Sequence, residues 1–107
     1  MATAWVTELE DISRPQPTSE AHSDVPVAKM PPVTVQKITF TTSTASNAFN
    51  ARTRFVRVFT DNAGAIAFLN FGTTPVATTS TTPIEDRATE YFGVIPGHKV
   101  AFYNGSA

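Results

Sequence analysis

Apolar and polar residues alternate along most of the chain after Pro32, which is the pattern of β-strands that bury one face. The alternation is strongest in five runs, residues 33–40, 54–60, 65–71, 90–95 and 98–104. In the first run the alternation changes phase across Gln36 and Lys37, which predicts a β-bulge there. Together the runs predict an all-β fold, either a small antiparallel β-sandwich or a jelly roll.

Turn residues separate these runs. The sequence DNAG at 61–64 has Asp first and Gly last, as a type I turn prefers, and it predicts that residues 54–71 form a hairpin. Pro96 and Gly97 fit the centre of a type II turn that joins the last two strands. Residues 41–53 are predicted to form a polar loop with Phe49 as a plug. A short edge strand is expected near residues 76–79.

The first 32 residues have a different character, because they hold five of the eight prolines and no Phe or Tyr. Within them, Trp5, Leu9 and Ile12 follow the i, i+4, i+7 spacing of one helix face, which predicts a short helix at 3–12. Residues 13–32 are predicted to be a semi-rigid, proline-rich spacer. The prediction is therefore an extended N-terminal arm, residues 1–32, attached to a β-sandwich body, residues 33–107.

The helix face is a candidate binding surface. A single helix of ten residues is marginal in water, so we expect it to form by laying Trp5, Leu9 and Ile12 in a groove on another molecule. The alternative is a frayed terminus that happens to contain a Trp.

Charge is also divided between the two parts. The arm has five acidic and two basic residues, a net charge of −3, and the body has six basic and four acidic residues, a net charge of +2. All charges between Val33 and Thr60 are positive, and we expect Arg52, Arg54 and Arg57 to contact acidic groups on a partner. The alternative is that both charged regions are ordinary solvated surface.

Size and composition point to association with other chains. A body of this length holds only about 3–5 kcal/mol from its core, and the chain has no cysteine for disulfides or thiolate metal sites. We therefore expect a homo-oligomer.

Motifs for chemistry are absent from the sequence. The two histidines, His22 and His98, have no nucleophile motif around them, and the spacing of His, Asp and Glu fits no metal site. The glycines lack phosphate-loop spacing. We expect no enzymatic activity, no cofactor and no metal.

Nucleic acid is not the expected partner either, because the net charge is −1. No segment has the roughly 18 apolar residues of a membrane span, and the N-terminus lacks the charged and apolar regions of a secretory signal.

Several stretches resemble a set of small proteins encoded among the virion structural genes of tailed bacteriophages. They are FVRVFTD at 55–61, IAF at 66–68, FGTTPVAT at 71–78, EYFGV at 90–94 and PGHKVAF at 96–102. The resemblance covers roughly residues 48–102 and implies a virion component, either a head decoration (cement) protein or an accessory head or tail protein. It carries no functional residues across.

These observations lead to a functional hypothesis, a decoration protein that binds the outer capsid shell and ties neighbouring subunits through its arm. The expected partners are the major capsid protein or other virion subunits. The expected location is the capsid surface, after synthesis in the host cytoplasm. One alternative is a tail or neck accessory protein. The other is a module that binds host-surface glycan through Trp5, Tyr91 or Tyr103.

Overall fold

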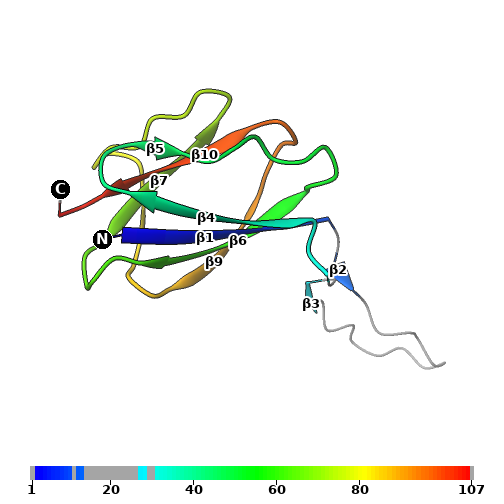
Figure 1. Ribbon diagram of the computed structural model, residues 1–107, viewed down its shortest axis with the longest axis horizontal. Helices are drawn as coiled ribbons and strands as arrows, with labels where there is room; N and C mark the ends of the chain where they lie inside the picture. The colour runs from blue at the N-terminus through cyan, green and yellow to red at the C-terminus, as the bar shows by residue number, and fades with distance from the viewer. Residues whose placement is uncertain (1, 11, 14–26, 29–30, 107) are drawn as a thin grey trace.

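The alternating runs form the strands of two antiparallel four-stranded sheets in the computed structural model, which describes residues 2–10, 12–13, 27–28 and 31–106. The two sheets pack face to face as a small β-sandwich, as Figure 1 shows. The predicted all-β sandwich is therefore confirmed. No helix capable of crossing a membrane is found within the described part of the chain.

The first sheet has the strand order β4 (Thr34–Phe40), β1 (Ala2–Leu9), β6 (Phe55–Asp61) and β9 (Thr89–Gly93). The second sheet has the order β5 (Thr44–Ala45), β10 (Lys99–Asn104), β7 (Ala67–Gly72) and β8 (Thr82–Ile84). Two further short strands, β2 (Ile12–Ser13) and β3 (Val27–Ala28), pair with each other alone.

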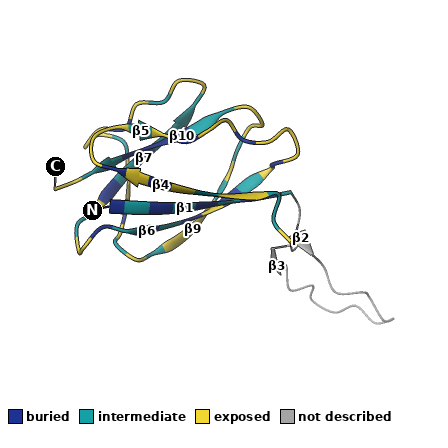
Figure 2. Ribbon diagram, in the orientation of Figure 1, coloured by how far each residue is buried: buried dark blue, intermediate teal, exposed yellow. Residues whose placement is uncertain are grey.

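The core lies between the two sheets and follows from the alternation. In β1, every second residue from Ala2 is buried, and the residues between them are half-buried on the outer face (Figure 2). The largest fully buried apolar side chains of the core cluster come from both sheets: Phe40, Val6, Val56 and Val58 from the first, and Phe102, Leu69, Ile84 and Val100 from the second. The rings of Phe40 and Phe102 meet across the sandwich with centroids 5.4 Å apart.

The predicted helix at 3–12 is wrong, because Ala2–Leu9 is a central strand of the first sheet. Ala2, Ala4, Val6 and Glu8 are all buried, so the segment follows a period of two, and the spacing of Trp5 and Leu9 misled the helical interpretation. Pairing with β4 on one side and β6 on the other supplies hydrogen bonds that an isolated helix lacks. The boundary at residue 32 is corrected accordingly, since residues 2–9 belong to the body. Residues 14–26 of the predicted spacer lie outside the described residues.

The predicted hairpin at 54–71 is wrong, and the two strands that the Pro96-Gly97 turn joins do not pair with each other either. Residues 55–61 and 67–72 lie in different sheets, and so do 89–93 and 99–104. In both cases the chain arches across the sandwich, because each strand buries its apolar face against the other sheet and finds its hydrogen-bonding neighbour elsewhere in the sequence. The Pro96-Gly97 turn is confirmed: His98 N–H donates to Ile95 O at 3.1 Å, and Gly97 has φ +85°.

Among the smaller predictions, the one for Phe49 is confirmed, and those for the bulge and the position of the edge strand are wrong. Phe49 is a plug, 3% exposed, as expected. The bulge at Gln36–Lys37 is wrong, because the register between β1 and β4 runs unbroken from Ala2↔Phe40 to Glu8↔Thr34. Val35 therefore lies outside and is 51% exposed. The short edge strand lies at Thr82–Ile84 rather than at 76–79.

Candidate functional site

The outer face of the first sheet carries aromatic and cationic side chains in two adjacent rows. One row runs across the strands as Lys37, Trp5, Phe59 and Thr89, and the next as Val35, Thr7, Arg57 and Tyr91. Phe55 lies two residues from Arg57 along β6, on the same face. We call this surface the aromatic face: Trp5, Val35, Lys37, Phe55, Arg57, Phe59 and Tyr91.

Ring contacts hold the aromatic face together. Trp5 and Phe59 have centroids 5.8 Å apart, and Phe55 and Tyr91 have centroids 6.3 Å apart. The Lys37 ammonium lies 5.9 Å from the centroid of the Trp5 ring, within the range of a cation–π contact. Cross-strand pairs of this kind fix the side chains on the sheet at low entropic cost. The face is therefore an ordered surface.

The aromatic face is open to solvent and positively charged. Tyr91 is 57% exposed and Val35 is 51% exposed, while Trp5, Phe55 and Phe59 are half-buried. Within the described residues, Lys37 and Arg57 form no ion pair, whereas Asp61, further along β6, lies 3.6 Å from Arg87 Nε. An exposed apolar surface with uncompensated cations is suited to binding a partner that has both apolar and acidic groups.

The structure brings together only two of the six residues predicted to bind a partner. Trp5 and Arg57 share the aromatic face. Leu9 is 1% exposed at the end of β1, so it is packed within this chain and is not displayed to a partner. Ile12 lies in β2, and its side chain is outside the described residues.

Arg52 and Arg54 lie elsewhere, at the end of the first sheet. Arg52 Nη2 donates to Glu10 Oε1 at 2.7 Å, and this contact raises the pKa of the Arg52 guanidinium. Both side chains are exposed, so the pair contributes little to stability. It is an attraction between an acidic residue of the N-terminal segment and a basic residue of the body. Arg54 is exposed, and its backbone pairs with Leu9 O and with Val94 N–H.

The aromatic residues proposed for glycan binding are divided between two surfaces. Trp5 and Tyr91 share the aromatic face, whereas Tyr103 lies on β10 of the second sheet, beside Phe68 of β7. Tyr103 therefore cannot join Trp5 and Tyr91 in one flat binding surface.

Sequence reasoning missed the buried carboxylate of Glu8, which lies within the segment predicted to be a helix. Glu8 is 1% exposed. Its Oε1 accepts hydrogen bonds from Asn50 N–H at 2.8 Å and Thr53 Oγ1 at 2.7 Å, and its Oε2 accepts one from Gln36 Nε2 at 2.8 Å. The signal was the strict period of two from Ala2, which puts Glu8 on the same side as Val6.

The Glu8 carboxylate joins three segments that are distant in sequence. Gln36 continues the network, since its Oε1 accepts from Asn47 N–H at 2.9 Å and its Nε2 donates to Asn47 O at 3.3 Å. The bonds from Glu8 thus connect the inner strand β1 and the edge strand β4 to the loop at 47–53. All the donors come from neutral groups, so this carboxylate acts as a structural acceptor.

A second carboxylate holds the loop between β6 and β7. Asp86 Oδ1 accepts from Asn62 N–H at 2.6 Å, and its Oδ2 accepts from Gly64 N–H at 2.8 Å. The hydrogen bond from Asn62 is the main cause that lowers the pKa of Asp86. The bond from Gly64 and the positive charge of Arg87 lower it further. Ala63 and Gly64 both have positive φ, 52° and 91°, so the turn needs such support.

Groups of three or more His, Cys, Asp or Glu side chains that could hold a metal ion do not occur among the described residues. His98 is half-buried after the Pro96-Gly97 turn, and its carbonyl accepts from Phe49 N–H at 2.8 Å. His22 lies outside the described residues.

Comparison of the chain with protein-family models, curated proteins and solved structures finds no match. The aromatic face is therefore the candidate site, on its geometry alone.

Proposed function

We propose that this chain is a non-enzymatic structural protein of a tailed-bacteriophage virion, a decoration protein that docks on the outer capsid shell through its aromatic face. Two lines support the proposal. The resemblance of residues 48–102 to small virion proteins indicates the class, and the open aromatic face supplies a surface of the composition that protein interfaces favour.

The observation that carries the proposal is the arrangement of Trp5, Arg57 and Tyr91 on one outer face. Trp, Tyr and Arg are the residues most enriched among those that dominate binding energy at interfaces. Arg57 has no ion pair within the described residues and is free to meet a carboxylate of the shell. Binding through these residues would combine apolar burial with charge complementarity.

The predicted role of the arm takes a different form, because a deletion of residues 1–32 would remove the central strand β1 and unfold the sheet. In place of the whole arm, we propose that residues 14–26, which follow β2 and precede β3 in the sequence, reach a neighbouring capsid subunit. Replacing residues 14–26 with a short Gly-Ser linker retains β1 and tests that role. Reduced shell binding by a folded variant is expected, and unchanged binding would rule out the arm's contribution.

A test of the proposed docking face uses matched charge reversals. The purified protein is mixed with undecorated phage heads and pelleted, and the bound fraction is measured for the wild type, Arg57→Glu and Lys99→Glu. Both substitutions change net charge equally, but Lys99 lies on the second sheet. We expect Arg57→Glu to weaken binding at least tenfold while Lys99→Glu leaves it within about twofold. Equal effects of both, or no binding by the wild type, would contradict the proposal.

A second candidate is glycan recognition, because Trp5 and Tyr91 share one exposed sheet face and flat aromatic surfaces stack on sugar rings. A carbohydrate array separates the two candidates. Specific glycan binding that is lost in Tyr91→Ala, together with no binding to heads, would favour the glycan module. Binding to isolated tails instead of heads would favour a tail or neck component.

A further inference from the structure

The four edge strands of the sandwich are protected to different degrees. β5 has two residues, β8 has three with Pro83 in its centre, and β9 has five, including Glu90 and a terminal Gly93. Short length, proline and charge are the usual devices that keep an edge from pairing with another chain. β4 has seven residues, TVQKITF, with four β-branched side chains and one charge. Among the described strands, β4 is the long edge without such protection.

The single charge on β4 does not guard its edge. Lys37 points onto the aromatic face, where its ammonium lies over the Trp5 ring. Within the described residues, β1 is the only strand of the first sheet that pairs with β4. An edge strand presents a row of unpaired backbone N–H and C=O groups on its free side. The natural partner for such a row is another extended backbone.

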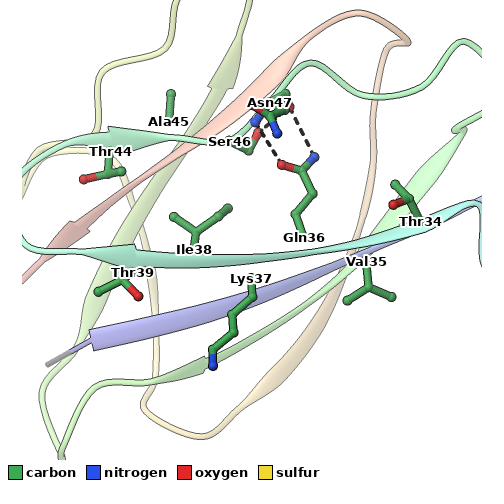
Figure 3. A pocket seen from close by; sticks show the side chains of 10 residues that line it. All are labelled: Thr34, Val35, Gln36, Lys37, Ile38, Thr39, Thr44, Ala45, Ser46 and Asn47. Carbon is green, nitrogen blue, oxygen red and sulfur yellow. Dashed lines mark hydrogen bonds between the residues drawn. The ribbon is translucent and has the colours of Figure 1, made fainter.

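A groove between the two sheets opens along the inner side of β4. An open groove of about 450 Å³ runs along the strand between residues 34–39 and residues 44–47. Figure 3 shows Thr34, Gln36 and Ile38 pointing toward the groove, and Val35, Lys37 and Thr39 pointing the other way. Gln36 crosses the groove to Asn47 near one end. An added strand would lie about 4.8 Å from β4 in the plane of the first sheet, and so beside this groove and not within it.

We propose that a second copy of this chain occupies this edge, with the two β4 strands antiparallel and Ile38 on the two-fold axis. This register places Ile38 against Ile38 of the partner subunit at the centre of the inner side of the seam, with Gln36 opposite Phe40 of the partner subunit on each side of it. It also places Lys37 opposite Thr39 of the partner subunit. An axis through Lys37 is excluded, because it sets two ammonium groups directly opposite each other. An axis through Gln36 is excluded because the Gln36 side chain is engaged by Glu8 and Asn47.

Pairing of the two β4 strands joins the first sheets of both copies into one continuous eight-stranded sheet. A two-fold axis that relates antiparallel neighbours is perpendicular to the sheet, so both aromatic faces point in the same direction and adjoin along the seam. A dimer thereby presents two copies of the aromatic face to a single partner surface, which raises avidity without any new contact. The dimer itself does not depend on the proposed shell binding and is tested without shells.

Substitutions at Thr39 test the register through opposite effects. Thr39 is exposed, and each Thr39 lies opposite Lys37 of the partner subunit, so each substitution acts twice per dimer. The dissociation constant of the dimer is measured by analytical ultracentrifugation. We expect Thr39→Glu to tighten the dimer roughly fivefold and Thr39→Lys to weaken it by a similar factor. Thr89→Glu and Thr89→Lys, on the exposed edge strand β9, are the matched controls and leave the constant unchanged.

Cysteine cross-linking tests the same contact directly, because the chain has no cysteine of its own. Lys37→Cys and Thr39→Cys are mixed and oxidised, and directly opposed cross-strand positions lie within disulfide range. We expect a disulfide dimer between the two variants, and none from a mixture of Thr89→Cys and Tyr91→Cys on β9. A chain that stays monomeric at millimolar concentration overturns the proposal, and the edge would then be available to an extended segment of a different protein. A dimer that is indifferent to both Thr39 substitutions also overturns it.

Discussion

The outer faces of the two sheets differ in whether other residues of the chain cover them. On the second sheet, Ala101 lies on the outer side of β10 and yet is fully buried, and residues 73–81 are bonded onto this face through Asn70 Nδ2, which donates to Val76 O at 3.2 Å. Ala77 of the same segment is 1% exposed. The first sheet has no such cover among the described residues, and its outer side carries the aromatic face. The chain thus covers one sheet itself and leaves the more apolar one open, which is the arrangement expected if a partner covers it.

Placing a carboxylate at the centre of each outer face should show this difference most strongly. Ala101→Asp buries an unpaired charge and is expected to destabilise the protein by at least about 3 kcal/mol. Thr7→Asp occupies the corresponding central position of the first sheet, beside Arg57, and should change stability by no more than about 0.5 kcal/mol. Urea denaturation measures both. Equal losses would show that the two faces are covered alike.

Removing the negative charge of Glu8 should have the next largest effect. Glu8→Gln retains the shape of the side chain but replaces one acceptor oxygen with an N–H₂ group, which opposes the donors of Asn50, Thr53 or Gln36. A loss of about 2 kcal/mol in the free energy of unfolding is expected, since hydrogen bonds to charged groups are strong. Glu10→Gln, on an exposed carboxylate nearby, is the control. A stability equal to that of the wild type would mean that Glu8 does not tie β1 to the 47–53 loop.

Truncating one tyrosine on each sheet tests which sheet binds the shell. Tyr91→Ala removes the most exposed aromatic side chain of the aromatic face and is expected to weaken shell binding roughly tenfold, or about 1.4 kcal/mol. Tyr103→Ala removes a ring from the second sheet and should leave binding unchanged. Circular dichroism checks that both variants are folded. Stronger impairment by Tyr103→Ala would assign docking to the second sheet.

The smallest effect concerns pH. Because the folded pKa of Asp86 is lowered, its contribution to stability is fully present above the unfolded pKa of about 3.9 and is lost as the pH falls through the lower folded pKa. Asp86→Asn removes this contribution, so its stability should fall less steeply with pH below about pH 4. Denaturation midpoints measured between pH 2 and pH 7 test this. Parallel profiles for the two proteins would mean that Asp86 does not hold the 62–64 turn.

Sequence patterns predicted the fold class but not its connections. The period-two runs identified most of the long strands, and Phe49 and the Pro96-Gly97 turn were placed correctly. Pairing was not predictable from local residues, because the same turns suit a hairpin and an arch, and only burial between sheets decides which one forms. The helix prediction failed at Trp5 and Leu9, whose spacing of four fits both periods, and β1 owes its stability to neighbours far along the chain.

The candidate site was predictable only in part, for the same reason. Trp5 and Arg57 were selected from composition and charge, but their common face depends on the register of β1 with β6. Tyr91, which was predicted only as a candidate for glycan binding, is exposed on the same face. The role of Glu8 could not be seen in the sequence, because its three donors come from residues 28, 42 and 45 positions away.

Cryo-electron microscopy of undecorated phage heads incubated with the full chain tests the central claim most directly. The account predicts regular density on the shell, with the first sheet against it and Trp5, Arg57 and Tyr91 at the contact. Density in which the second sheet and residues 73–81 face the shell would contradict the proposed docking face. Bare shells at saturating protein concentration would contradict the decoration function itself.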